Sequence, residues 1–503
     1  MEQAAPAPAG MLSDGQARRL AWLVAALWLA MRLPWMGRSI WYDEWLRTRQ
    51  WLTGHTAELA ILHDVHNPLY NAFMYVWIRV FGDSPEAIRT PGVLAGAIAT
   101  YALGRWAWGG VSRGAALAAC AIVAVSPMHV RACVEAKNVS FVVAFCTLAA
   151  VAAARLAERP AWRRAAALGA AGALALWTSF LGFLVLLPLW GWLVASAFRR
   201  GDRRAVAGAM AALGLAVLLA APILIYKAEH AEELARNYLE PFNPTQVWVL
   251  VTVWLSGLVG AVPEFRYQIG LSLLVAAALA APLVLGWRAV RRAPGGGAIV
   301  AAFAGPIGVM AVASAVQLAR HGPDPEQHIY QARNLAMVLP TFAMLVGAGL
   351  MAMPKGAARR ALGPLLVGIG AAGTVMMFTV HRYRATTGPA AAPWPRLVEM
   401  MRQDSGGEPR ILVARQSAFE SAYYDPDLQF VHTGYKPLVP REVLGLARER
   451  GVRHVYVFDQ LQWGRAMGDE YYRLLKTRLR LRPMFEKGVI RLWKVEATKL
   501  PWE

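Results

Sequence analysis

The chain has 503 residues, of which 57% are hydrophobic, and its mean hydropathy is +0.36. This apolar share exceeds that of ordinary soluble domains, which excludes a soluble enzyme and indicates an integral membrane protein. The net charge of +20 comes from short basic clusters between apolar runs, a pattern typical of cytoplasmic loops and not of a nucleic-acid-binding face.

The N-terminal end of the chain predicts a cytoplasmic start and a first membrane span. Residues 1–17 are rich in Ala and Pro, and we expect them to form a disordered cytoplasmic tail. Arg18 and Arg19 then precede an apolar run that is too long and too poorly ended for a cleaved signal peptide. The polar loop over residues 41–70 is therefore expected to face outward.

The later apolar runs predict a bundle of about 11 spans in total. The run within residues 67–82 is too short to cross a hydrocarbon core of about 30 Å, so it predicts an interfacial or re-entrant helix. Residues 246–260 and 269–286 are both apolar, but two crossings would place the basic cluster at Arg288 outside. We therefore expect 246–260 to be re-entrant. The spans after the first are expected at about residues 86–104, 115–127, 139–154, 165–177, 181–197, 205–225, 269–286, 297–315, 334–352 and 361–380.

This topology places the C-terminal part of the chain outside the cytoplasm. Residues 18–382 form the predicted transmembrane domain, 383–395 a linker, and 396–503 a soluble α/β domain. Strand patterns occur at 410–414, 428–432 and 454–458, helix patterns at 440–451 and 469–480, and Lys487-Gly488 predicts a hairpin. The predicted fold is a polytopic α-helical membrane protein with a small C-terminal α/β extracytoplasmic domain.

Two adjacent carboxylates, Asp43 and Glu44, follow the first span directly. An aspartate near low-dielectric surroundings can have a raised pKa and take a proton from an alcohol. Alternatively, Asp43 is the N-cap of a helix that runs to Thr53, and Glu44 pairs with Arg47 or Thr48 one turn later. The two interpretations are compatible.

The same loop contains His63, Asp64 and His66, which could be metal ligands. Two histidines at i and i+3 without a further motif make a weak metal signal, and solvated loop histidines are more frequent. The functional alternative is hydrogen bonding to a phosphate oxygen at the membrane surface. No cofactor is predicted, and a divalent metal is possible without being required. Nor do the three cysteines have a spacing that indicates a disulfide or a zinc site.

Cations in two other predicted outer segments suggest an anionic ligand. Glu135 can pair with Arg131 at i, i+4, which would leave Lys137 free for an anion, although charges there can also be interfacial. Arg333 opens an apolar run, where an unpaired cation is costly. A base in one loop and cations in others are what transfer from a lipid phosphate requires, because charge grows on the leaving phosphate.

The order of these motifs resembles a known family. Asp43-Glu44, the HNPLY segment at 66–70, FGDSPEAIRTPGVLAGAIATYALGR at 81–105 and SPMHVRACVEAKN at 126–138 are similar to polyprenyl-phosphate-sugar-dependent glycosyltransferases of the GT-C fold. That group includes the protein O-mannosyltransferases and the aminoarabinose transferases of lipid A. The likeness covers about residues 20–150 and, more loosely, the Arg333 region.

The resemblance implies a role for each matching residue. Asp43 is the catalytic base and Glu44 supports the loop, while His66, Arg131, Lys137 and Arg333 bind the donor phosphate. Glu135 and Tyr70 are supporting residues. Asn67 stands where the family usually has proline and Lys137 where it has arginine, and a Tyr-rich stretch after the Ser-Pro turn is missing, so the sugar stays unspecified.

We therefore predict an inverting glycosyltransferase that moves a sugar from an undecaprenyl-type phosphate to a lipid, glycan or protein hydroxyl. The reaction is expected on the outer face of the bacterial inner membrane. The alternatives are a lipid or solute transporter or flippase, and an oligosaccharide transferase that uses a diphosphate-linked donor. Charges that collect in outer loops, without an internal repeat, favour an enzyme over a transporter.

The predicted C-terminal domain carries no evident catalytic set. Ser421, Asp425 and His432 are too scattered in the sequence to predict a triad. A structural cap and an acceptor-binding platform both remain open for this domain.

Overall fold

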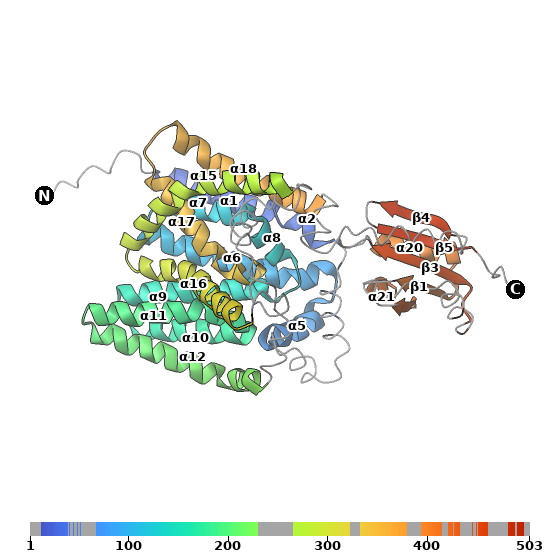
Figure 1. The fold of residues 1–503 in the computed structure, drawn as a ribbon, viewed down its shortest axis with the longest axis horizontal. Coiled ribbons are helices and arrows are strands. Elements are labelled where there is room, and N and C mark those ends of the chain that lie inside the picture. Colours follow the sequence, from blue (N-terminus) through green and yellow to red (C-terminus); the bar gives the residue numbers. More distant parts are fainter. Residues whose placement is uncertain are drawn as a thin grey trace. The chain divides into compact units, whose positions relative to one another are not determined.

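The computed structural model consists of two compact units, which Figure 1 draws as a ribbon. One unit comprises Met1–Met36 with Gly54–Val375, and the other comprises Gly37–Thr53 with Met376–Glu503. The structure describes residues 12–38, 40, 44, 48, 51, 67–229, 265–321, 332–379, 394–414, 421–425, 427–432, 445, 449, 451–460, 481–487 and 490–496.

The first unit is a bundle of helices. Its described helices are α1 (Asp14–Ala30), α2 (Leu33–Met36), α5 (Pro68–Phe81), α6 (Pro85–Gly110), α7 (Arg113–Val125), α8 (Pro127–Val134), α9 (Val139–Glu158), α10 (Trp162–Thr178), α11 (Phe183–Arg199), α12 (Arg203–Glu229), α15 (Phe265–Arg292), α16 (Gly296–His321), α17 (Leu339–Ala352) and α18 (Ala357–Thr379), with 3₁₀ turns η1 (Phe180–Gly182) and η4 (Ala332–Val338).

Serine caps explain where several of these helices begin. The Oγ atoms of Ser13, Ser84, Ser112 and Ser126 each accept a backbone N–H of the first turn, at the starts of α1, α6, α7 and α8. A serine at this position satisfies an N–H that the helix itself leaves unpaired. Because Ser13 caps α1, this helix begins at Asp14, inside the stretch that we expected to be a disordered tail.

Small residues allow the central helices to approach each other closely. The most buried spans are α9 and α17, whereas α12, α15 and α18 expose apolar side chains such as Leu218. A Cβ atom added to Gly347 of α17 would lie 2.6 Å from the backbone nitrogen of Ala119 in α7. Membrane helices pack through such small residues, because lipid provides no hydrophobic driving force between them.

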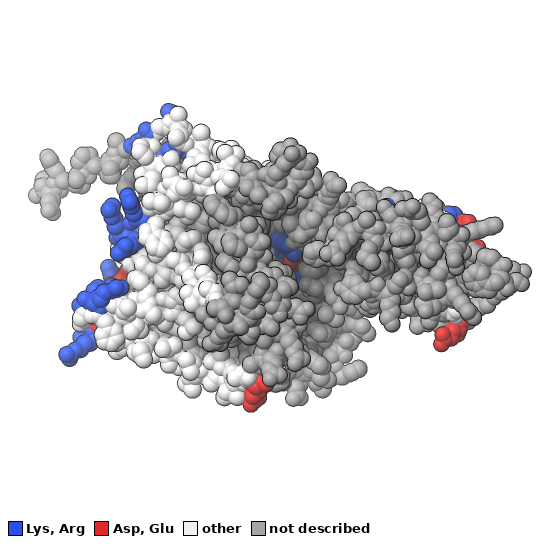
Figure 2. Space-filling model, in the orientation of Figure 1, with Lys and Arg blue, Asp and Glu red and all other residues white. Residues whose placement is uncertain are grey.

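The membrane character of this unit agrees with the sequence. Six described helices are long and apolar enough to cross a membrane, and seven if α7 and α8, bent by 63°, form one broken span. The number of crossings, about 11, stays a prediction, and the expected re-entrant segment 246–260 lies outside the described residues. Lys and Arg side chains gather at one side of the helical unit, as the predicted cytoplasmic loops require (Figure 2).

One predicted loop is instead helical. Residues 126–138 were expected to form an outer loop, but Pro127–Val134 folds as α8. Pro127 stands at the first helical position, where its fixed φ is favourable and its missing N–H costs nothing. The Ser-Pro pair therefore ends one helix and starts the next.

The second unit contains a five-stranded sheet of order β2-β1-β3-β5-β4. Its strands are β1 (Arg410–Ala414), β2 (Gln429–His432), β3 (His454–Gln460), β4 (Leu481–Lys487) and β5 (Ile490–Val495). β1 pairs in parallel with β2 and β3, and β5 pairs antiparallel with β3 and β4. The three predicted strands and the predicted hairpin are confirmed.

Helix α20 (Trp394–Ser405) covers this sheet, although its first two residues were expected to belong to the linker. Trp394, Leu397 and Met401 of α20 (Trp394–Ser405) are buried against Leu412 and Phe458. The spacing i, i+3, i+7 places these side chains on one face of the helix. The predicted helix at 469–480 lies outside the described residues, and of 440–451 only Gly445, Glu449 and Gly451 are described.

Candidate functional site

The predicted site residues differ in how much of them the structure describes. Asp43 and His66 lie outside the described residues, and for Arg333 only the backbone, in η4, is described. Glu44 is helical and completely buried, as is Thr48, whose Oγ1 donates to the Glu44 carbonyl oxygen over 2.7 Å. The roles predicted for Asp43, His66 and Arg333 stay predictions.

The Arg131–Glu135 ion pair is confirmed. Arg131 Nε donates to Glu135 Oε1 over 2.6 Å at the C-terminal end of α8, and the Glu135 side chain is only 8% exposed. Lys137 has an interaction partner of its own, so the ion pair does not leave it unpartnered, and its role at the donor phosphate stays a prediction. An arginine held by a buried carboxylate keeps a fixed orientation, because each partner limits the rotamers of the other.

Arg32 and Thr374 stabilise the break between α7 and α8. The last carbonyls of a helix have no partner within it, and a break exposes them inside an apolar bundle. Here Arg32 donates to the carbonyls of Val123 and Ala124 over 3.4 and 3.0 Å, and Thr374 Oγ1 donates to that of Val125 over 2.7 Å. Side chains from two other segments thus satisfy the end of α7.

The same arginine fixes the protonation of a buried histidine. Arg32 is fully buried, lies 3.8 Å from the centre of the Trp28 ring, and its Nη2 atom is 2.7 Å from His129 Nδ1. Because arginine offers only donors, His129 Nδ1 must accept, which leaves a neutral imidazole with its proton on Nε2. Cys133 Sγ lies 3.6 Å from the same Nδ1 atom. Arg32 was not among the predicted site residues, although a charged residue at the end of an apolar run is a signal for such a role.

Tyr70 is held in the helical core. It lies on α5, is 1% exposed, and contacts Phe141 of α9 edge to face with ring centres 5.2 Å apart. Trp77 of α5 also donates from Nε1 to the Ala87 carbonyl oxygen of α6 over 2.9 Å. The HNPLY segment therefore leads into a helix that is anchored to both α6 and α9.

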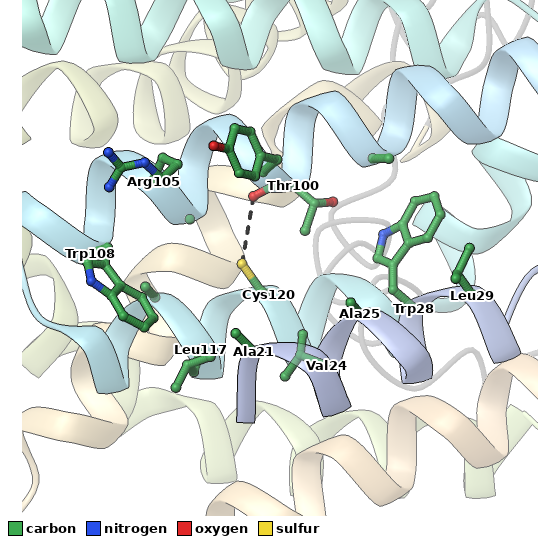
Figure 3. A pocket seen from close by; sticks show the side chains of 14 residues that line it. Ala21, Val24, Ala25, Trp28, Leu29, Thr100, Arg105, Trp108, Leu117 and Cys120 are labelled. Atoms are coloured by element: carbon green, nitrogen blue, oxygen red, sulfur yellow. Dashed lines mark hydrogen bonds between the residues drawn. The ribbon is translucent and has the colours of Figure 1, made fainter. Parts of the chain in front are cut away.

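An apolar pocket of about 510 Å³ lies between α1, α6 and α7 (Figure 3). Cys120 Sγ donates to the Thr100 carbonyl oxygen over 3.7 Å at its wall, and Arg105 and Trp108 lie together at one end. The chemistry of this pocket suits a hydrocarbon chain. Its lining residues are Ala21, Val24, Ala25, Trp28, Leu29, Ala97, Thr100, Tyr101, Gly104, Arg105, Trp108, Ala116, Leu117 and Cys120.

Asp425 of the second unit forms ion pairs with arginines that hold α20 and β1, which is a structural role. Its carboxylate is completely buried and pairs with Arg410 of β1, and its other oxygen lies 3.4 Å from Arg402 of α20. Within the described part of the chain, no group of three or more His, Cys, Asp or Glu residues could hold a metal ion.

Comparison with known proteins links this fold to membrane glycosyltransferases. Residues 65–226 match a family described as dolichyl-phosphate-mannose-protein mannosyltransferase, and no curated protein sequence matches the chain. The structure of ArnT from Cupriavidus metallidurans bound to undecaprenyl phosphate is 12% identical with a TM-score of 0.55, covering 97% of this chain and 99% of ArnT. The apo structure of ArnT is 11% identical to this chain with a TM-score of 0.59, and the match covers 95% of this chain and 98% of ArnT.

A third similar structure is the oligosaccharyltransferase of Archaeoglobus fulgidus tethered to an acceptor peptide. It is 12% identical with a TM-score of 0.50, and the match covers 88% of this chain and 69% of that one. At such identities these likenesses establish the fold. The chain is a polytopic membrane protein of the GT-C fold with a small C-terminal α/β domain, and the resemblance drawn from its motifs is confirmed.

Proposed function

We propose that this GT-C-fold protein is an inverting glycosyltransferase that moves a sugar from a polyprenyl phosphate to a hydroxyl group. The observation that carries the proposal is the Arg131–Glu135 pair at the end of the broken α7–α8 segment. It lies within the stretch that matches the mannosyltransferase family. A cation fixed by a nearly buried carboxylate suits recognition of a phosphate.

The proposed reaction is a single displacement. Asp43 takes the proton of the acceptor hydroxyl, whose oxygen attacks the anomeric carbon as the bond from that carbon to the phosphate oxygen breaks. The products are the glycoside, with inverted configuration, and the polyprenyl phosphate. Arg131, Lys137, Arg333 and His66 would stabilise the negative charge that grows on the leaving phosphate.

Placement on the outer face is supported by the charge distribution along α7. Arg113, at the N-terminal end of this helix, pairs with Asp14 of α1 and lies 3.3 Å from the Leu12 carbonyl oxygen. The opposite end of α7 leads into α8 and the Arg131–Glu135 pair. If the basic end is cytoplasmic, as the positive-inside rule favours, α8 belongs to the outer side of a bacterial inner membrane.

A panel of donors tests this proposal against the two alternatives. The full-length protein in detergent is incubated with undecaprenyl-monophosphate sugars, an undecaprenyl-diphosphate oligosaccharide and hydroxyl acceptors, with and without EDTA. We expect transfer from a monophosphate donor that persists in EDTA. A transporter gives no transfer in detergent, where no compartments exist, and metal-dependent use of only the diphosphate donor supports an oligosaccharide transferase.

A further inference from the structure

A hydrogen bond joins Ile40, directly before the first predicted outer loop, to Tyr424 of the C-terminal domain. The backbone N–H of Ile40 donates to Tyr424 Oη over 2.9 Å, although the residues are 384 positions apart. Ile40 is completely buried, as are Glu44 and Trp51 further along the loop. All belong to the compact unit that Gly37–Thr53 forms with Met376–Glu503. The first part of the loop, up to Thr53, therefore belongs to the unit that holds the sheet.

Tyr424 itself is held by a buried framework. It ends the short helix α21 (Ser421–Tyr424), and the next residue, Asp425, is completely buried and ion-paired with Arg410 of β1. The Asp425 N–H donates to the Ser421 carbonyl oxygen over 3.0 Å, which closes the helical turn. Removing one partner of a buried ion pair is strongly destabilising, so α21 is firmly attached to the sheet. The Tyr424 hydroxyl is thus a fixed acceptor.

The bond lies close in sequence to the proposed base. Asp43 follows Ile40 by three residues, so a fully extended chain between them spans at most about 11 Å. A fixed backbone at Ile40 reduces the number of conformations open to the residues after it. A displacement of about 1 Å at a reacting group can lower a rate about 100-fold. The position of Ile40 therefore matters for where the Asp43 carboxylate can lie.

We propose that Tyr424 is a positioning residue for Asp43, through which the C-terminal domain holds the start of the catalytic loop. This inference rests on the proposed function. The effect acts on the base and not on the cations assigned to the donor phosphate. Loss of the hydroxyl should therefore lower kcat and leave the donor KM and the pH dependence of the rate unchanged.

Tyr424→Phe in the full-length protein tests the proposal, because it removes the acceptor and keeps the ring. We expect exchange of the Ile40 amide hydrogen, measured without any ligand, to become about fivefold faster, the effect of one net hydrogen bond. With the undecaprenyl-phosphate sugar found active in the donor panel, we expect kcat to fall about tenfold. Tyr423→Phe, which removes a neighbouring hydroxyl, is the control and should behave as wild type.

Unchanged exchange at Ile40, or unchanged kcat, overturns the proposal. If Tyr424→Phe unfolds the domain, Ile40→Pro removes the same hydrogen bond by deleting its N–H donor. An unaltered kcat in Ile40→Pro would also overturn the proposal. Asp43→Asn distinguishes a failure of the positioning role from a failure of the proposed base. An inactive Asp43→Asn with a fully active Tyr424→Phe rejects only the positioning role, whereas an active Asp43→Asn rejects the proposed base.

Discussion

The Glu135 carboxylate accepts from Arg131 Nε over 2.6 Å while it is almost shielded from solvent. Removing a carboxylate from water costs free energy, and the ion pair with Arg131 offsets that cost only while the pair persists. The pair thus fixes the direction of the guanidinium, which we assign to the donor phosphate.

Glu135→Gln should weaken donor binding. The substitution keeps the size of the side chain and removes the charge that orients Arg131, so the donor KM is expected to rise about tenfold, the value of a charged hydrogen bond. Steady-state kinetics with varied donor measure this change. Glu158→Gln, at the exposed end of α9, provides the control. An unaltered donor KM in Glu135→Gln would remove the Arg131–Glu135 pair from the donor site.

At the scale of elements, the break between α7 and α8 determines where the Arg131–Glu135 pair can lie. The two helices meet at an angle of 63°, and Arg32 and Thr374 donate to carbonyls at the C-terminal end of α7. Ser126 caps the N-terminal end of α8 by accepting from the His129 N–H. Polar groups on both sides of the break thus find partners inside the bundle, which is the condition for irregular backbone at membrane depth.

Arg32→Met should destabilise the helical unit. Methionine fills much of the same space but removes the donor to the Val123 and Ala124 carbonyls, and leaving two buried carbonyls unsatisfied costs about 3 kcal/mol or more. The melting temperature of the purified protein in detergent is expected to fall by several degrees. Arg105→Met on α6, where the arginine is exposed, should leave it unchanged. Equal melting temperatures for the two variants would contradict the role given to Arg32.

The C-terminal domain contains a charged cluster that predicts a pH dependence of its stability. Burial raises the pKa of Asp404, but hydrogen bonds from Lys494 and Tyr456 and the charges of Lys494 and Arg482 outweigh it and lower the pKa below its usual 3.8. A lowered carboxylate pKa contributes stability that is complete above the unfolded pKa and is lost as the pH falls through the folded value.

Asp404→Asn should therefore flatten the acid limb of the unfolding curve. We expect the wild-type protein to keep this contribution from neutral pH down to about pH 4 and to lose it below. Calorimetry of the full-length protein between pH 7 and pH 3 measures the difference. Glu399→Gln on the exposed face of α20 should follow the wild-type curve. A wild-type pH dependence in Asp404→Asn would show that the cluster contributes no such stability.

At the scale of the whole molecule, the helices and strands follow from local patterns. Apolar runs and a Lys-Gly hairpin are local signals, and they predicted most of the described helices and all five described strands. The pair of Arg131 and Glu135 was predictable too, because i, i+4 spacing brings side chains together on any helix.

Contacts between distant segments could not be predicted from those patterns. Nothing in the sequence near Ile40 indicates that its N–H meets Tyr424. Val123 and Ala124, whose carbonyls accept from Arg32 at the break, lie 91 and 92 positions from it. The α8 helix was missed because its eight residues are too few to show a clear apolar period. Such contacts depend on how the elements pack, which a single sequence does not reveal.

The central claim is that Asp43 is the base of a lipid-phosphate-dependent sugar transfer. Turnover by wild type and Asp43→Asn, with melting temperatures matched to confirm folding and the anomeric configuration of the product read by NMR, tests it most directly. We predict a product of inverted configuration and a rate at least about 100-fold lower in Asp43→Asn. Undiminished turnover by Asp43→Asn, or a product of retained configuration, would contradict the claim.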